Sequence, residues 1–188
     1  MNELLFDKAK TGDLEAFETL IKSYEKLIYN AAYRMLGNAH DAEDASQEVI
    51  LKVYRSLSSC NSAGAFKSWL FRIINNTCID EIRKRKGKST ISIDADYSDV
   101  DSHSENPLLK DNNTPESEFL RADLSKNIQI AIDSLPPDYK GAIVMRDING
   151  LSYDEIADAL NINIGTVKSR IARGRKKLRD ELVLLEQN

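Results

Sequence analysis

The sequence lacks any long apolar stretch. No run of eighteen apolar residues occurs in its 188 residues, so we expect no transmembrane helix. Met1–Leu4 contain no basic segment followed by an apolar one, so we expect no secretion signal and a cytoplasmic protein. Apolar residues make up 41% of the chain and charged residues 30%, as in ordinary soluble proteins.

Residues that bind metals or act as nucleophiles are also scarce. Histidine occurs only at His40 and His103, and cysteine only at Cys60 and Cys78, with no spacing typical of ligand pairs. We therefore expect reduced thiols, no metal ion and no cofactor. The sequence has no glycine-rich phosphate loop and no nucleophile motif, which makes an enzyme the least favoured class.

An excess of positive charge is absent too, since the net charge is −4. The acidic excess lies in the middle of the chain, because residues 87–117 carry seven acidic and two basic side chains. Basic residues gather instead at Arg83–Lys86 and Lys168–Arg179. Such local patches, more than the total charge, determine where phosphate binds.

The first half of the chain has the periodicity of helices. Asp13 can cap a helix whose apolar stripe runs over Phe17–Met35, and Gly37-Asn38 ends the stripe. We expect further helices over Asp41–Leu57 and from about Phe66, separated by a serine-rich loop.

Residues 87–117 are too polar to bury a core, and Gly87 ends the preceding helix. They indicate a flexible acidic linker. We therefore predict an all-α fold with two small helical domains, residues 1–86 and 118–188, whose relative placement varies.

In the second half, an apolar stripe over Leu124–Leu135 predicts a helix that ends at Pro136-Pro137. Asp138 can cap the next helix, which turns at Asn149-Gly150.

A helix-turn-helix follows. Ser152 and Glu155 have the spacing of a capping box, so a short helix begins there. Asn161 and Asn163 suit a tight turn, because short amide side chains bond local backbone and tolerate unusual dihedral angles. In the next helix the inward positions are Val167, Ile171 and Leu178.

The other face of that second helix carries Thr166, Ser169, Arg170 and Arg173. Hydroxyl and guanidinium groups can bond base edges and phosphates in a major groove. A solvated basic helix face is the simpler alternative. Cap, turn, core spacing and charge agree with one another, which favours DNA binding.

Two polar clusters stand out in the first half. Acids crowd the start of the helix near Asp41, where the helix dipole alone could explain them. Their exposed carboxylates also suit a basic partner surface. In the helix from Phe66, Asn76, Asp80 and Arg83 share one face, and Arg72 with Arg83–Lys86 can neutralise phosphates. Trp69 is expected in the core more than as a stacking platform for bases.

Four segments together resemble the extracytoplasmic function (ECF) sigma factors of bacterial RNA polymerase. Asp41–Val49 and Phe66–Thr77, leading to Arg83–Lys86, resemble the first conserved domain of that family (sigma region 2). Ser134–Pro137 and Gly150–Arg170 resemble the second (sigma region 4). The likeness covers nearly the whole chain, in the family's order.

The resemblance implies a dissociable subunit that binds core RNA polymerase, recognises the −10 promoter element through its first domain and the −35 element through its second, and is controlled by an anti-sigma factor. It implies no membrane insertion of the chain itself. The implied residues are, for polymerase docking, Asp41, Glu43, Asp44, Gln47 and Glu48; for the −10 element, Arg72, Asn76, Asp80, Arg83 and Lys84; and for the −35 element, Thr166, Lys168, Ser169, Arg170, Ala172 and Arg173.

A stand-alone DNA-binding regulator is the main alternative, since similar helix-turn-helix domains also end response regulators. Such a protein would need a receiver or ligand domain in front. The first half shows no alternation of strands and helices, which argues against a receiver.

Overall fold

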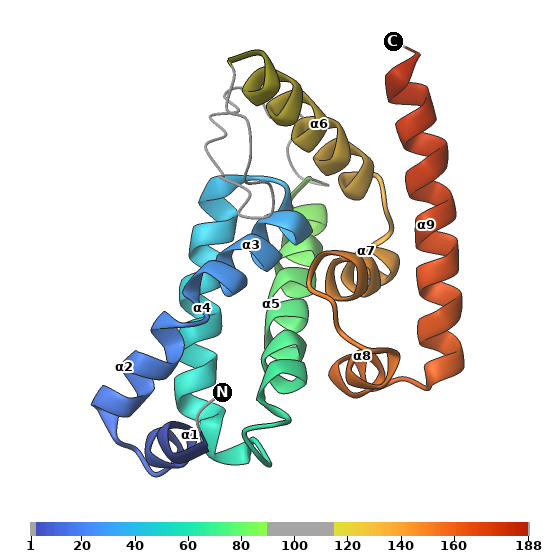
Figure 1. Cartoon of the computed structure of the whole chain (residues 1–188). Helices are drawn as coiled ribbons and strands as arrows, with labels where there is room; N and C mark the ends of the chain where they lie inside the picture. The colour runs from blue at the N-terminus through green and yellow to red at the C-terminus, as the bar shows by residue number, and fades with distance from the viewer. Residues whose placement is uncertain (1–2, 90–114, 188) are drawn as a thin grey trace.

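The fold is entirely helical in the residues that the structure describes. The computed structural model describes residues 3–89 and 115–187, with side chains placed for 3–85, 124–185 and 187, and this part contains no strand, which confirms the all-α prediction. The elements run, in chain order (Figure 1), α1 (Glu3–Lys10), α2 (Leu14–Lys22), α3 (Glu25–Leu36), α4 (Ala39–Ser56), a 3-10 turn η1 (Leu57–Ser59), α5 (Phe66–Ser89), α6 (Pro115–Asp133), α7 (Pro137–Ile143), a π-helical turn η2 (Val144–Ile148), α8 (Tyr153–Leu160) and α9 (Ile164–Glu186).

The apolar stripe over Phe17–Met35 belongs to two helices, where the sequence predicted one. The break lies at Ser23 and Tyr24, where the Ser23 hydroxyl donates to Leu20 O (2.6 Å) and Tyr24 N donates to Ile21 O (2.7 Å). Both helices bury the same face, so the spacing of apolar residues did not reveal the break. The sequence analysis also missed α1, whose Phe6 is buried in the same core.

The turn at Gly37 and Asn38 was predicted correctly, but the next helix begins two residues before Asp41. Gly37 has a left-handed backbone (φ 81°), which a glycine adopts without a steric cost. Asn38 then caps α4, because its side-chain oxygen accepts from Asp41 N at 2.9 Å. Asp41 therefore lies in the first turn of α4.

Aromatic side chains fill the centre of the first half. Phe66 is fully buried, and its ring lies 5.9 Å from that of Phe6, 5.1 Å from that of Tyr24 and 5.9 Å from that of Trp69, measured between centroids. The pairs with Phe6 and Tyr24 are edge-to-face, and aromatic pairs at such distances add to the free energy gained from burial. Trp69 is only 7% exposed, which agrees with the core position expected for it.

Two helix ends differ from the predictions around the linker. Helix α5 continues through Gly87 to Ser89, and α6 begins at Pro115, so both helices extend into the predicted linker. Most of the linker, residues 90–114, lies outside the described residues. The N-cap of α7 is Pro136 with Pro137 at the first helical position, and Asp138 lies in the first turn. A proline at that position has the φ a helix needs and gives up no intrahelical hydrogen bond, and no side chain caps α7.

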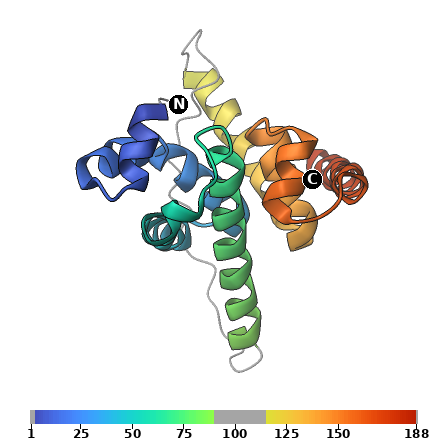
Figure 2. The same ribbon diagram turned by 90° about the horizontal axis from the view of Figure 1, so that it is seen from below.

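The two halves lie against each other. Helix α5 runs between the N-terminal helices and the group formed by α7, α8 and α9 (Figure 2), and α8 packs along it. Helix α6 packs on α3 in the same way. One continuous apolar core therefore joins both halves, from Phe6 to Ile171. Whether this placement varies in solution, as the linker predicts, stays a prediction.

Replacing Phe66 by alanine should lower the free energy of unfolding by about 3–5 kcal/mol, because the change leaves a cavity among three rings. Chemical denaturation of the full chain measures the loss. Leu14→Ala is the matched control, since Leu14 is 56% exposed and should change stability by less than about 0.5 kcal/mol. Equal effects of the two substitutions would contradict this account of the core.

Candidate functional site

The helix-turn-helix begins with the predicted capping box. Glu155 N donates to Ser152 Oγ at 3.2 Å, and Ser152 N donates to Glu155 Oε2 at 2.7 Å. The bond from the Ser152 backbone lowers the pKa of the Glu155 carboxyl below its usual value of 4.5. The start of α8 is thus fixed by two residues that are three positions apart in the chain, as the sequence indicated.

The turn between α8 and α9 depends on two asparagines. Asn161 adopts a left-handed backbone (φ 53°) and ends α8, with its N–H donating to Ala157 O and Asp158 O. Asn163 caps α9, because its Oδ1 accepts from Thr166 N at 2.8 Å and from Thr166 Oγ1 at 3.0 Å. The Thr166 hydroxyl therefore helps to cap the helix. Its proton is used in that bond, and its oxygen can still accept a hydrogen bond from a partner.

Helix α9 is held against the rest of its half by apolar contacts and one glycine. Val167 and Ile171 are buried as predicted, and Leu178 is partly buried against the core. A Cβ added at Gly174 would lie 2.7 Å from Ile143 Cγ1, so only glycine lets α9 approach α7 this closely. Sequence analysis missed this role, because a lone glycine in a helix gives no sign of which neighbour it faces.

The residues predicted to read the −35 element differ in how exposed they are to solvent. Lys168, Ala172 and Arg173 are exposed on α9, whereas Thr166 and Ser169 are half-buried. The Ser169 hydroxyl donates to Thr166 O at 2.9 Å. Lys168 and Arg173 give this exposed set two positive charges in the first turns of α9.

Arginines of α9 differ in what they contact inside the protein. Arg170 Nη2 lies 3.5 Å from Asp138 Oδ2 of α7, and the Arg170 side chain is only 23% exposed. Arg175 makes a two-pronged contact with Asp147, with Nε to Oδ2 at 3.0 Å and Nη2 to Oδ1 at 2.5 Å. Planar guanidinium–carboxylate pairs of this kind fix orientation. Arg173 is exposed and has no such contact among the described residues, so its guanidinium group faces solvent.

The residues predicted to read the −10 element line the outer face of α5. Arg72, Asn76, Asp80 and Arg83 are all exposed, spaced so that they lie along one side of the helix. Arg83 Nη1 lies 3.7 Å from Asp80 Oδ1, so these two side chains partly neutralise each other. The serine-rich loop before α5 lies next to the Arg72 end of this face, and Ser59 and Arg72 line one groove.

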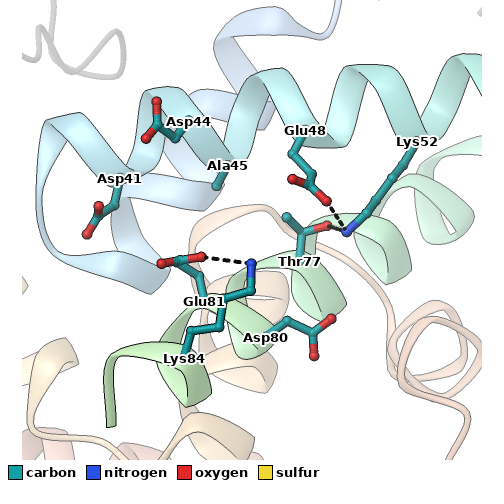
Figure 3. A pocket seen from close by; sticks show the side chains of 9 residues that line it. All are labelled: Asp41, Asp44, Ala45, Glu48, Lys52, Thr77, Asp80, Glu81 and Lys84. Carbon is teal, nitrogen blue, oxygen red and sulfur yellow. Dashed lines mark hydrogen bonds and ion pairs between the residues drawn. The ribbon is translucent and has the colours of Figure 1, made fainter. Parts of the chain in front are cut away.

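A groove of about 350 Å³ between α4 and α5 brings the docking residues and the −10 residues together (Figure 3). Lys52 Nζ bridges the two helices, 3.0 Å from Glu48 Oε1 and donating to Thr77 Oγ1 at 3.0 Å. The hydrogen bond from Lys52 lowers the pKa of the Glu48 carboxyl, which favours its charged form. The groove is lined by Asp41, Asp44, Ala45, Glu48, Lys52, Thr77, Asp80, Glu81 and Lys84.

The predicted docking residues divide into a structural member and exposed members. Asp41 forms an ion pair with Arg85 of α5 and accepts from Asn38 Nδ2 at 2.8 Å, and its side chain is 25% exposed. Asp41 thus holds the start of α4 against α5. The other four predicted docking residues are exposed: Glu43, Asp44, Gln47 and Glu48. Of these, Glu48 is paired with Lys52.

Two large apolar side chains extend this acidic face, and the sequence analysis did not name them. Leu51 is 53% exposed and Tyr54 is 52% exposed on α4. With Gln47 they follow a spacing of four and three residues, which places all three on one side of the helix. That spacing was the available signal. The sequence analysis did not interpret this spacing as a surface feature, because apolar residues at helical spacing ordinarily indicate a core face.

Other kinds of site receive no support from the described part of the chain. It contains no cluster of three histidine, cysteine or acidic side chains arranged to hold a metal ion. None of its helices combines the length and apolar composition needed to cross a lipid bilayer. Cys60 and Cys78 are buried and unpaired with each other, and burial raises the pKa of the Cys78 thiol to about 12.

Both halves match known domain families. The sigma-70 region 2 family matches residues 20–88, and the sigma-70 region 4 family matches residues 125–178. The two conserved regions of a sigma-70-type transcription initiation factor are therefore present in one chain. They coincide with the helices that carry the acidic groove and the helix-turn-helix.

Similarity to curated relatives shows to which family of sigma factors the chain belongs. The chain is 39% identical over 176 residues to the ECF RNA polymerase sigma factor SigW of Bacillus subtilis, covering 93% of each protein. It is 33% identical over 177 residues to the ECF RNA polymerase sigma-E factor of Escherichia coli, covering 94% of this chain and 92% of the relative. It is 39% identical to SigE of Mycolicibacterium smegmatis, but spans only 65% of that protein. The chain belongs to the ECF family of RNA polymerase sigma factors.

Solved structures agree on the fold. CnrH, solved in complex with the cytosolic domain of CnrY, matches 99% of this chain and 97% of its own length, with a TM-score of 0.68 and 22% identity. The sigma factor RpoE of Bartonella quintana, solved with the anti-sigma factor NepR, matches 90% of this chain and 98% of its own, with a TM-score of 0.67 and 22% identity.

Replacing Glu155 by glutamine should change how stability depends on pH. The Glu155 pKa is depressed in the folded protein, so its contribution is fully present above its usual value of 4.5 and is lost as the pH falls below it. The free energy of unfolding of the unmodified protein should therefore fall more steeply between about pH 5 and about pH 3 than that of the variant. Urea unfolding at several pH values tests this, and parallel curves would contradict it.

Proposed function

We propose that this sigma factor divides promoter recognition between two exposed polar faces. The outer face of α5, with Arg72, Asn76 and Arg83, contacts the −10 element as the strands open. The exposed face of α9, with Lys168 and Arg173, contacts the −35 element as duplex. The observation that carries this proposal is the capped helix-turn-helix with its basic face turned to solvent, in a chain that belongs to the ECF family.

We further propose that the exposed acidic side of α4 docks on core RNA polymerase. Glu43, Asp44, Gln47 and Glu48 offer charge to a basic surface, and Leu51 with Tyr54 adds apolar area beside them. Protein interfaces commonly have a polar rim with hydrogen-bonded charges around an apolar centre from which water is excluded, and this side of α4 has both kinds of residue. This docking needs no cofactor and no metal ion.

An anti-sigma factor is the third partner that we propose. The sigma factor RpoE, which has this fold, was solved in complex with the anti-sigma factor NepR, and CnrH, which has the same fold, was solved with the cytosolic domain of CnrY. Since transcription initiation takes place where core polymerase works, we propose that the chain acts in the cytoplasm.

Transcription in vitro tests the function directly. The purified chain is added to sigma-free core polymerase with fragments of the genome from which the gene comes, and the RNA start sites are sequenced. We expect new starts that share two spaced elements and that vanish when the chain is left out. Specific binding of promoter duplex by the chain alone, without any binding to core polymerase, would instead favour the stand-alone regulator.

Replacing Asp44 by lysine should weaken assembly with core polymerase, because it reverses an exposed charge at the centre of the acidic face. Binding is measured by fluorescence anisotropy of the labelled chain, and circular dichroism checks the fold. Glu18→Lys on α2 is the matched control, as an exposed charge reversal away from this face. Equal affinities of both variants and the unmodified chain would remove Asp44 from the docking surface.

Replacing Arg173 by alanine should lower the affinity of the holoenzyme for promoter DNA by about 1–3 kcal/mol if the side chain reads a base. The loss should then depend on the sequence of the −35 element. Arg179→Ala, another exposed arginine further along α9, serves as the control. An equal loss on every −35 sequence would show that Arg173 contacts phosphate.

A further inference from the structure

One arginine of α9 is held by an acid from the turn that precedes the helix-turn-helix. Arg175 of α9 and Asp147 of η2 form a two-pronged pair, with Nε to Oδ2 at 3.0 Å and Nη2 to Oδ1 at 2.5 Å. The side chain of Arg175 is 49% exposed and that of Asp147 is 31% exposed. The pair therefore lies at the surface, where a binding partner can reach both charged groups.

Arg175 lies on the side of α9 that we propose meets DNA. It follows Lys168 by seven residues, which is close to two full turns of an α-helix, so both side chains leave the helix on the same side. Seven residues correspond to about 10 Å along the helix axis. Both side chains are exposed. A free guanidinium group at position 175 would therefore extend the basic stripe that Lys168 begins.

The turn η2 gives Asp147 a defined place beside α9. Leu151 N donates to Met145 O at 3.0 Å, and Arg146 Nη1 donates to Leu151 O at 2.6 Å. The guanidinium group of Arg146 also lies 4.7 Å from the centre of the Tyr153 ring, close enough for a cation–π contact. These contacts tie η2 to the start of α8. Asp147 comes next in the chain and contacts α9 (Figure 1), so adjacent side chains of η2 hold the two helices of the motif separately.

The other arginines of α9 are placed differently. Arg173 precedes Arg175 by two residues, which corresponds to about 200° around the helix, so the two side chains point to different sides. Arg170 is paired more loosely, because its Nη2 makes one contact of 3.5 Å with Asp138, whose side chain is 64% exposed. The pair of Arg175 with Asp147 is thus the tighter of the two, and its loss would leave Arg173 in place.

The number of phosphate contacts determines the part of DNA binding that does not depend on sequence. For duplex DNA, the logarithm of the binding constant falls with the logarithm of the salt concentration with a slope of about −0.9 per phosphate contact. An arginine that is already paired makes such a contact only by leaving its carboxylate, which then stays near the phosphate and repels it. A pair of this kind therefore removes one cation from a DNA-binding face.

We propose that Asp147 is an internal counterion that keeps Arg175 from contacting DNA and thereby limits the sequence-independent affinity of α9 for duplex DNA. This inference rests on the proposed function of the α9 face. Asp147 acts through Arg175, so it is a positioning residue. With this arginine withheld, promoter binding depends more on the residues that read the −35 element and less on charge alone.

Removal of the acid tests this proposal. Asp147→Ala should free Arg175, and the salt slope for binding of a random-sequence duplex should steepen by about 0.9, the value of one phosphate contact. The gain in affinity should be about 3.5-fold larger at about 50 mM than at about 200 mM salt, because the fourfold change in salt is raised to the power of about 0.9. Fluorescence anisotropy of the labelled duplex measures binding by the holoenzyme, assembled from core polymerase and the full chain.

Two further variants separate the freed arginine from the lost acid. Asp180→Ala removes another exposed acid, from α9 itself, and changes the net charge equally, so its salt slope should stay close to the original value. The double variant Asp147→Ala/Arg175→Ala has the net charge of the unmodified chain and should restore the original slope. A double variant that keeps the steeper slope would show that the carboxylate acts without Arg175, and would overturn the proposal.

A promoter duplex separates a counterion from a structural brace. Because the added contact reads no base, Asp147→Ala should raise the affinity for promoter and random duplexes by the same factor. A lower affinity for the promoter duplex with an unchanged slope would mean that the pair only holds α9 in place, and would overturn the proposal. Circular dichroism checks the fold, and Asp147→Asn, which removes the charge and keeps the shape, replaces the alanine variant if that one does not fold.

The proposed function and this inference fail in different ways. If the unmodified chain produces no new RNA start sites with core polymerase, the proposed function is wrong. If it does produce them, and the salt slope of Asp147→Ala equals that of the unmodified chain, only the role of Asp147 as a counterion is wrong.

Discussion

Helix α5 is the element on which the rest of the structure depends, because three different surfaces share its circumference. Phe66, Leu70 and Ile74 bury one side against the N-terminal helices. Asn75 faces α7, and α8 packs along the helix toward its beginning. Arg72, Asn76 and Asp80 occupy the side that remains open to solvent. A rotation of this helix would disturb the core, the contact between the halves and the polar face at once, so each surface fixes the position of the other two.

Local chemistry explains why the helix-turn-helix could be predicted in detail. Ser152 with Glu155, the left-handed Asn161 and the Asn163 cap each act on residues within four positions, so a short sequence window contains the whole interaction. The same holds for Gly37 and Asn38. The break at Ser23 could not be predicted in this way. The apolar stripe continues across it, and the ring of Tyr24 packs on Phe66, more than forty residues later in the chain.

Contacts between distant segments limit how much of the candidate sites can be predicted from the sequence. The exposed faces of α4, α5 and α9 could be predicted from spacing and charge, but their internal partners could not. Arg170 and Arg175 look alike in the sequence to Arg173, yet aspartates of the preceding elements hold the first two. Asp41 looks like one acid among several, yet its pairing with Arg85 makes it part of the α4–α5 contact. Which of several similar charged residues is paired inside the protein follows from the tertiary fold, and a periodic sequence pattern does not reveal it.

The buried thiol of α5 gives the protein a chemical property of its own. Burial raises the pKa of the Cys78 thiol to about 12, so the thiolate is scarce at neutral pH. Peroxides and alkylating agents attack the thiolate, so they find almost no reactive form at this position. Burial of Cys78 within the packing of α5 therefore leaves this thiol far less reactive toward oxidants than an exposed cysteine would be.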